Sequence, residues 1–288
     1  MMQDTDVFQK VIQAVPEVHP FLFRGSKTFD FFEEAVLASA ASVFGSNGVQ
    51  NSSLFDQVQI SLPYVEMGAI NSTHLFGLDE LILFAFYASQ RKNVQKVADV
   101  GANIGLHSMV LSKLGFDVKC FEPDEKHIEI MKQNFTINNV SNVEINQRAV
   151  STRKGKAQFV RVVGNTTGSH LEGAKDSYGD LEHFEVEVED FRKIIDWADF
   201  LKIDVEGHEA TLICNTVKDH WAGVDAVLEI GNLENAVKIF NHGQKHGINF
   251  FCQKIGWHLA KDVTDLPASH KEGSVYVSLR EKMPWPGN

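Results

Sequence analysis

The stretch VADVGANIGLHS, residues 97–108, decides the fold of this chain. A short apolar run leads into Asp99, and two glycines four residues apart, Gly101 and Gly105, follow before a helix-like segment. Glycine permits backbone angles that are closed to other residues, and the first amides of a helix are free to bind a ligand. The pattern is therefore typical of a strand that delivers its carboxyl end to a ligand, although a tight turn without a ligand would also explain it.

The spacing of the glycines favours one kind of ligand over another. A dinucleotide fingerprint has the order G-x-G-x-x-G, which seats a pyrophosphate on the helix N-terminus. This loop is Gly-Ala-Asn-Ile-Gly and lacks the middle glycine. Asp99 would repel a phosphate but could accept a hydrogen bond from an ammonium group. A zwitterionic cofactor without phosphate is therefore favoured.

From residue 96 onward, strand-like and helix-like segments alternate along the chain. Such alternation predicts crossover units and a mostly parallel sheet, which binds its ligands at the carboxyl ends of the strands. The expected strands are 96–101, 117–122, 143–147, 157–163, 184–188, 199–204, 224–230, 248–253 and 274–280. The expected helices between them are 105–114, 124–138, 190–196, 207–218 and 232–246.

The first 75 residues differ in texture from the rest. Residues 29–45 and 77–90 have apolar side chains at helical spacing, whereas 46–53 is loop-like and 58–67 is strand-like but interrupted by Pro63. Because the segment is rich in aromatic residues, we expect 1–75 to form a mainly helical extension that covers the site or mediates a dimer contact.

The second strand of the alternating region ends on an acid. FDVKCFEPD, residues 116–124, places Glu122 about twenty residues after the glycine loop. A carboxylate at this position can accept hydrogen bonds from both ribose hydroxyls of an adenosine. An isolated glutamate would by default be a solvated strand-end acid, and the preceding glycine loop is what favours the ribose.

Four motifs in order resemble the FkbM-type S-adenosylmethionine-dependent methyltransferases: the glycine loop, CFEPD (120–124), NFTINNVSNVEINQRAVS (134–151) and FLKIDVEGHEATLI (200–213). The resemblance spans residues 95–231, and KIDVEGHE is its most specific part. It implies an α/β, Rossmann-like class I methyltransferase fold, a seven-stranded mostly parallel sheet with helices on both faces and its last strand antiparallel. It also implies that residues 76–288 form the domain that binds S-adenosyl-L-methionine and releases S-adenosyl-L-homocysteine.

The resemblance assigns cofactor contacts residue by residue. The methionine part of the cofactor would be surrounded by Asp99, Gly101, Ala102, Asn103 and Gly105. Glu122 would hold the ribose, Ala149 would line the adenine, and Asp204 would lie beside the methyl group that is transferred. His107 opens the helix after the glycine loop and could approach the cofactor, with packing as the alternative role.

The segment FLKIDVEGHE, residues 200–209, carries the expected catalytic residues. A hydroxyl or amide acceptor is a weak nucleophile that benefits from a nearby base. The candidates are Asp204, Glu206 and His208, together with Lys202, which shares a strand face with Asp204. Lys202 could instead be a charge partner for a neighbouring acid, and Glu206 could cap the following helix.

A divalent ion is a further option that the sequence leaves open. Asp204 and Glu229 end neighbouring strands, and hard cations bind carboxylate oxygens. Two acids do not make a metal site, so no metal is predicted. The polar segments 163–168 and 169–184 lie between two expected strands, and we expect them to face the acceptor, a solvent-exposed insertion being the alternative.

Composition narrows the function further. A net charge of -11 on 288 residues argues against a nucleic-acid partner, whose affinity depends on clustered lysine and arginine. No apolar run is long enough to span a membrane, the first residues are unlike a signal peptide, and three scattered cysteines favour reduced thiols in the cytoplasm. A homodimer is compatible with the aromatic extension.

We therefore expect a cytoplasmic methyltransferase that moves a methyl group to an oxygen of a small molecule, a sugar or another natural product. Nitrogen of a peptide or an amide side chain is the alternative acceptor. Two alternatives come from other classes: an NAD-dependent oxidoreductase, disfavoured by the missing glycine, and a non-catalytic cofactor-binding scaffold. The sequence does not name the acceptor.

Overall fold

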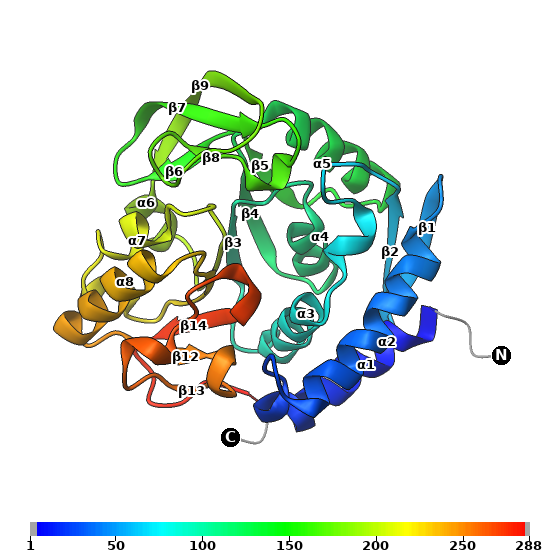
Figure 1. Cartoon of the computed structure of the whole chain (residues 1–288), viewed down its shortest axis with the longest axis horizontal. Helices are drawn as coiled ribbons and strands as arrows, with labels where there is room; N and C mark the ends of the chain where they lie inside the picture. Colours follow the sequence, from blue (N-terminus) through cyan, green and yellow to red (C-terminus); the bar gives the residue numbers. More distant parts are fainter. Residues whose placement is uncertain (1–4, 286–288) are drawn as a thin grey trace.

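An eight-stranded sheet forms the centre of the molecule, which the computed structural model describes over residues 5–285 (Figure 1). In their order across the sheet, the strands are β13 (His258–Leu259), β12 (Asn249–Cys252), β14 (Ser274–Ser278), β11 (Asp225–Glu229), β10 (Phe200–Ile203), β3 (Lys96–Val100), β4 (Asp117–Phe121) and β5 (Val143–Asn146). The strands from β11 to β5 are parallel, and β14 runs antiparallel to both of its neighbours. The predicted mostly parallel sheet with a late antiparallel strand is confirmed.

One edge of this sheet differs from the seven strands that were expected. The extra strand, β13, has two residues and pairs antiparallel with β12. Between them the chain turns back through Gly256 and Trp257, which both have positive φ angles. A two-residue strand after such a turn leaves no hydrophobic pattern to recognise, so the sequence did not predict it.

The order of the strands reverses between β3 and β10, because the chain builds β4 and β5 on one side of β3 and then returns to β10 on the other. The chain therefore continues after β3 to a helix on one face and after β10 to a helix on the other, which leaves a crevice at the carboxyl ends of these two strands, where open α/β sheets bind ligands. The glycine loop follows β3, and the segment with Asp204 follows β10.

Helices cover both faces of the sheet and enclose two cores, as predicted. On one face lie α3 (Leu78–Gln90), α4 (Leu106–Lys113) and α5 (Glu125–Ile137), and on the other α6 (Phe191–Ile195), α7 (Glu209–Ile213) and α8 (Leu233–His246) (Figure 1). Neighbouring strand residues alternate between the cores: Val97 belongs to one and Ala98 to the other. The 3-10 turns described are η1 (His19–Phe21), η2 (Ser72–Leu75), η3 (Thr166–Gly168), η4 (Lys218–Trp221), η5 (Gln253–Ile255), η6 (Val263–Asp265) and η7 (His270–Glu272).

A second, four-stranded sheet stands above the carboxyl ends of the main sheet (Figure 1). Its strands, in order, are β6 (Ala149–Ser151), β9 (Leu181–Asp190), β7 (Gly155–Val162) and β8 (His170–Leu171). The expectation that 157–163 and 184–188 continue the alternating parallel pattern is wrong, because β7 and β9 pair antiparallel with each other. Residues 163–180 between these two strands form no helix longer than a 3-10 turn, and β8 within them pairs antiparallel with β7.

The N-terminal segment adds two helices and a hairpin beside α3. Its elements are α1 (Thr5–Val18), α2 (Lys27–Phe44), β1 (Val49–Phe55) and β2 (Val58–Pro63). The rings of Phe8, Phe44 and Phe76 stack in its core. The expectation of a loop over 46–53 is wrong, since β1 begins at Val49 and pairs antiparallel with β2. Its stretch Gln-Asn-Ser-Ser is polar because most of the hairpin is exposed or only half-buried.

Two further findings concern the surface and the thiols. Within residues 5–285, every helix is too short or too polar to cross a membrane. Cys120 and Cys252 are buried free thiols, as expected, whereas Cys214 is exposed.

Candidate active site

The glycine loop is built around a close approach between two strand ends. Gly101 has a φ of 83°, and a Cβ placed on it would lie 1.7 Å from the backbone oxygen of Asp204. Only glycine fits here, because the loops after β3 and β10 touch at this point. Asn103 also has a positive φ, 52°, and this conformation directs its backbone N–H to Glu122, at 2.8 Å from Oε2.

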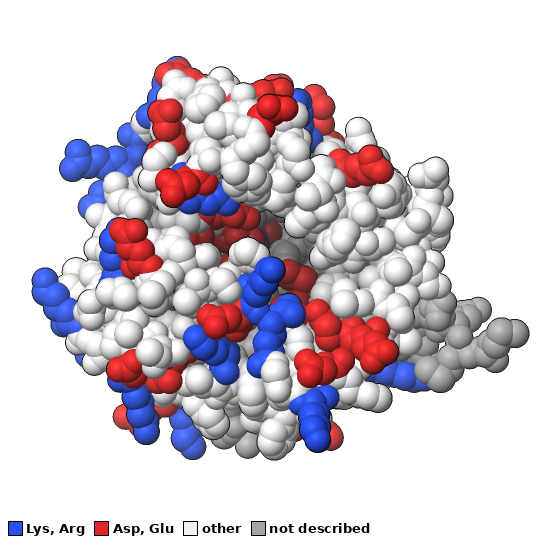
Figure 2. All heavy atoms as spheres, viewed as in Figure 1, with Lys and Arg blue, Asp and Glu red and all other residues white. Residues whose placement is uncertain are grey.

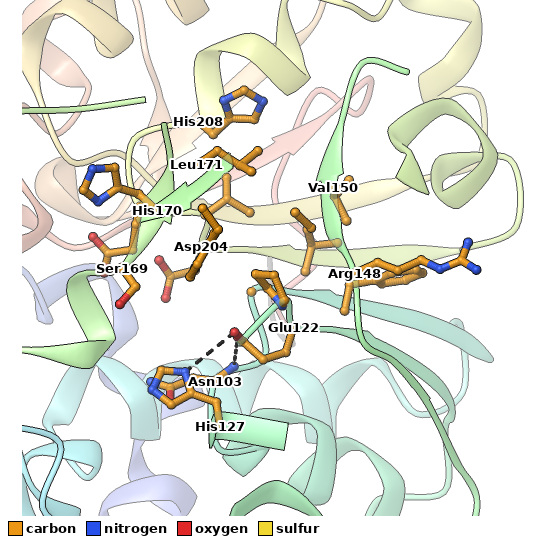
Figure 3. Close-up of a pocket in the computed structure, with 18 of the residues that line it drawn as sticks. Asn103, Glu122, His127, Arg148, Val150, Ser169, His170, Leu171, Asp204 and His208 are labelled. Carbon is orange, nitrogen blue, oxygen red and sulfur yellow. Dashed lines mark hydrogen bonds and ion pairs between the residues drawn. The ribbon is translucent and has the colours of Figure 1, made fainter. Parts of the chain in front are cut away.

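The carboxylate of Glu122 is held from several sides (Figure 3). Besides the amide of Asn103, the amide of Asp124 donates to its Oε1 at 2.9 Å. The imidazole Nδ1 of His127 lies 3.6 Å from the same oxygen. Glu122 is 5% exposed, so these neighbours, together with whatever enters the adjoining cavity, have to satisfy its charge.

A cavity of about 600 Å³, open on one side to solvent, lies over the ends of β3, β4 and β10 and under the small sheet. The cavity joins predicted residues from four separate parts of the chain: Gly101, Asn103, Glu122, Ala149, Asp204, Glu206 and His208. It is not lined by the remaining predicted site residues, which are Asp99, Ala102, Gly105, His107 and Lys202.

Asp99 and Lys202 form the buried floor beneath the glycine loop. The Ser108 hydroxyl donates to Asp99 at 2.6 Å, and the ammonium of Lys202 lies 3.8 Å from the other Asp99 oxygen. Lys202 also donates to the carbonyl of Gly101 and, at 3.3 Å, to Asp204. Burial alone would lower the pKa of Lys202, but Asp204 and Asp99 raise it above its ordinary value. These contacts favour the role of charge partner over that of a base.

Ala102 and Gly105 shape the start of α4 rather than the cavity wall. A Cβ on Gly105 would lie 2.6 Å from Met131 and 2.8 Å from Phe135, both on α5. The glycine therefore allows α5 to pack against the loop. Ala102 is buried, and its N–H donates to the carbonyl of Phe121.

His107 faces α3 rather than the first cavity. Its Nδ1 lies 3.0 Å from the hydroxyl of Tyr87, and its Nε2 lies 2.7 Å from a carboxylate oxygen of Glu80. Both partners lie on a helix that precedes the glycine loop in the chain. The sequence did not indicate these contacts, since nothing local to the loop shows which helix covers it.

Asp204 connects the first cavity to a second, acidic one. The second cavity is lined by Asp204, Asp79, Glu80 and Glu229, with Lys202 as its buried cation. Figure 2 shows acidic atoms gathered in the hollow at the middle of this face. Burial, together with Asp204, Glu80 and Glu206, raises the pKa of Glu229 well above its ordinary range. Burial would also raise the pKa of Glu80, but His107 and Lys202 lower it overall.

Glu206 and His208 lie where the first cavity meets the loop between β8 and β9. Lys175 of that loop donates to Glu206 at 2.5 Å, and Glu206 has a positive φ of 52°. His208 Nε2 lies 2.9 Å from the hydroxyl of Ser151, and burial lowers the pKa of His208. His208 is therefore mainly neutral at pH 7.

Several residues of the cavity were missed at the level of sequence. His170 is buried, with its two ring nitrogens 3.0 Å from the carbonyl of Gly168 and from the hydroxyl of Ser177. Of the other polar lining residues, His127 was missed as well, whereas Arg148 adjoins the predicted Ala149, and the segments expected to face the acceptor contain Thr166, Thr167 and Ser169. The polar segment 163–184 did indicate a role for part of this set, although residues 166–171 lie over the first cavity rather than over the second.

Potential metal ligands do not gather in the part of the chain that the structure describes. Across residues 5–285, no group of three or more His, Cys, Asp or Glu side chains is arranged to hold a metal ion. Asp204 and Glu229, considered as a pair above, both line the second cavity.

Comparison with known proteins agrees with this geometry. The methyltransferase FkbM domain matches residues 99–245, just over half of the chain, and includes the glycine loop, Glu122 and Asp204. The chain belongs to the FkbM methyltransferase family. It is thus an S-adenosylmethionine-dependent methyltransferase with a class I fold, as the four motifs predicted. Among the curated proteins, no match was found.

Solved methyltransferase structures also resemble the chain at low identity. A SAM-dependent methyltransferase from Agrobacterium tumefaciens is 9% identical, with a TM-score of 0.44, 82% of this chain and 71% of that chain being covered. A precorrin-6y C5,15-methyltransferase from Geobacter metallireducens is 14% identical, with a TM-score of 0.37 and coverages of 68% and 85%. A ribosomal protein L11 methylase from Lactobacillus delbrueckii is 12% identical, with a TM-score of 0.37 and coverages of 69% and 77%.

The residues of the first cavity fit S-adenosylmethionine. The side-chain oxygen of Asn103, which lines this cavity, is enclosed without a hydrogen-bond donor from the described residues, and the carboxylate of Glu122 lines the cavity as well. Acceptors without donors suit a ligand that brings an ammonium group and ribose hydroxyls.

Proposed function

We propose that this methyltransferase moves the methyl group to an oxygen of a small molecule and that Asp204 accepts the proton. The observation that carries the proposal is the position of Asp204 in the walls of both cavities. The first cavity has the residues expected to hold the adenosine, namely Glu122 and Ala149. The second is then left for the acceptor.

Bound S-adenosylmethionine supplies an electrophilic methyl group, so the protein has to position the acceptor and remove one proton. Asp204 is half-buried, with an exposed side-chain fraction of 31%, and Lys202 donates to one of its oxygens. A carboxylate in this state could accept the hydroxyl proton while the methyl carbon exchanges its bond to the cofactor's sulfur for a bond to the acceptor oxygen. Glu206 and His208 are second candidates for this proton, because both line the first cavity, whose wall includes Asp204.

Nitrogen is a second candidate acceptor, favoured by the charge of the second cavity. Glu80, whose pKa is lowered, remains ionised and would attract an amine or another N–H donor. An acceptor nitrogen of a peptide or an amide side chain would bind against the same acidic wall of the second cavity. No comparable observation on the described residues favours an NAD-dependent oxidoreductase or a non-catalytic cofactor-binding scaffold.

We also propose that residues 1–75 support the cofactor site as a bracing extension and that residues 76–288 are the methyltransferase domain. The support for this lies in residues 67–69. Ala69 donates to the carbonyl of Gly164 at 2.8 Å, and Thr166 donates to the carbonyl of Met67 at 3.0 Å. Thr166 lines the first cavity, so the extension holds part of its cover. A dimer contact through the same extension is compatible with this role.

Two variants test the proposal by separating binding from turnover. Asp204→Asn keeps the shape of the side chain but removes the base, so kcat should fall by about 100-fold or more while S-adenosylhomocysteine binds within a few-fold of the wild type. Glu122→Ala should weaken that binding by about 10- to 100-fold. The assay would follow labelled methyl transfer to panels of hydroxyl and amine acceptors. Unchanged turnover in Asp204→Asn would remove Asp204 from the mechanism, and transfer to amines alone would replace oxygen by nitrogen.

A further inference from the structure

We infer that His127 is a positioning residue for the cofactor and acts through the carboxylate of Glu122. The inference rests on the proposed role of Glu122 toward the ribose. His127 lies in the first turn of α5, lines the first cavity and is 4% exposed. In Figure 3 its ring lies beside Glu122, on the side of Asn103.

The contacts of the His127 ring show which neighbour its polar nitrogens interact with. Nδ1 lies 3.6 Å from Glu122 Oε1, whereas Nε2 is enclosed and has no hydrogen-bond partner within residues 5–285. A buried nitrogen without a partner destabilises the fold, and an apolar side chain of similar size would fill the space without that cost. The contact with Glu122 is the one that an apolar side chain could not provide.

The charges around His127 support the same contact. Burial alone would lower the pKa of His127, but Glu122 and Asp124 raise it overall, against the opposing charge of Arg161. Arg161 forms a two-bond ion pair with Asp124, at 2.6 and 2.7 Å, which largely balances that carboxylate. Glu122 remains as the carboxylate that faces the imidazole.

Glu122 is thereby fixed on three sides. The amides of Asn103 and Asp124 bind one oxygen each, and the ring of His127 lies against the oxygen that Asp124 also binds. The remaining lone pairs are left for the cavity that Glu122 lines. A carboxylate that is held in place before binding loses less freedom when a diol binds, so the affinity gained through His127 should depend on the ribose hydroxyls.

A calorimetric comparison of two ligands tests this dependence: S-adenosylhomocysteine and its 2′,3′-dideoxy analogue. In His127→Leu the affinity for S-adenosylhomocysteine should fall about tenfold, and that for the analogue less than about twofold. His127→Gln keeps an N–H donor and should restore most of the loss. His170→Leu is the matched control, because His170 is a buried ring of the same cavity that contacts Gly168 and Ser177 instead of a carboxylate. It should change both affinities by the same factor.

The outcomes separate the inference from the function on which it rests. Equal losses for both ligands in His127→Leu, or no rescue in His127→Gln, would overturn the inference alone and make the ring a packing element. A wild type that binds both ligands equally would overturn the ribose role of Glu122 and the inference with it. A wild type that binds neither would overturn the cofactor assignment itself. Thermal melting of each variant would verify that it is folded.

Discussion

At the scale of single residues, the first cavity depends on contacts between strand ends. Gly101 and Glu122 could be predicted from the sequence because each follows directly on a strand, and strand ends meet at one edge of a parallel sheet. His127 and Glu80 could not, because their roles depend on how α5 and α3 pack against that edge. Local patterns indicate the loop but not the helices that cover it.

Gly101 offers a test of the approach between the two strand ends. Gly101→Ala would place a Cβ 1.7 Å from the backbone oxygen of Asp204, so the loops would have to separate. Binding of S-adenosylhomocysteine should fall by more than about tenfold. Gly115→Ala is the control, since its φ of 96° is also positive but no atom lies within 4 Å of the added Cβ. The control should lose about 1–2 kcal/mol of stability from backbone strain and keep its affinity. Equal affinities in the two variants would contradict the account.

At the scale of elements, the sequence predicted the strands of the main sheet but not how the strands outside it pair. The alternation after residue 96 predicted β3, β4, β5, β10, β11, β12 and β14 because buried parallel strands are apolar and separated by helices. Strand-like segments at 58–67, 157–163 and 184–188 were also expected, whereas β1, β6, β8 and the antiparallel pairing of β7 with β9 were not, since short or half-exposed strands carry polar residues such as Asn51. The positions of these strands depend on which strand each one pairs with, and no local sequence pattern specifies the partner.

The contact between the N-terminal extension and the cover of the cavity can be tested at Gly68. A Cβ there would lie 2.0 Å from the carbonyl oxygen of Gly164. Gly68→Ala should therefore speed hydrogen exchange over residues 163–169 and weaken binding of S-adenosylhomocysteine several-fold. Gly25→Ala has nearly the same φ, 87° against 90°, and open space around its Cβ. If Gly68→Ala and Gly25→Ala show the same rate of hydrogen exchange over residues 163–169, the extension does not brace this loop.

The turn between β10 and α7 should show its own pH dependence. Glu209 accepts hydrogen bonds from the amides of Val205 and Gly207, but burial raises its pKa to about 7. An acid whose pKa is raised on folding contributes stability that is complete below its unfolded pKa and is lost as the pH rises through 7. From pH 5 to 8 the melting temperature of the wild type should therefore fall by several degrees relative to Glu209→Gln.

Glu234→Gln provides the matched control for this titration. Glu234 is exposed, and its hydrogen bond to Lys238 lowers its pKa, so its titration lies below this pH range. The difference between this variant and the wild type should stay constant from pH 5 to 8. A constant difference for Glu209→Gln as well would mean that Glu209 is ionised throughout and that the turn gains nothing from its protonation.

At the scale of the whole molecule, three parts of the chain meet at one crevice. The main sheet supplies the glycine loop, Glu122 and Asp204, the small sheet covers them, and the N-terminal extension contacts that cover. The family could be predicted from four short motifs, and each of them contributes residues to the first cavity. The acceptor could not, since the second cavity is formed by residues as far apart as Asp79 and Ser274.

The central claim is that the first cavity binds S-adenosylmethionine rather than a dinucleotide. The most direct measurement is a calorimetric titration of the purified protein with S-adenosylhomocysteine, with NAD as a parallel ligand. We expect S-adenosylhomocysteine to bind with one site per chain and Glu122→Ala to weaken this binding. NAD should give no heat of binding. Binding of NAD with no binding of S-adenosylhomocysteine would contradict the reading of the glycine loop and the function built upon it.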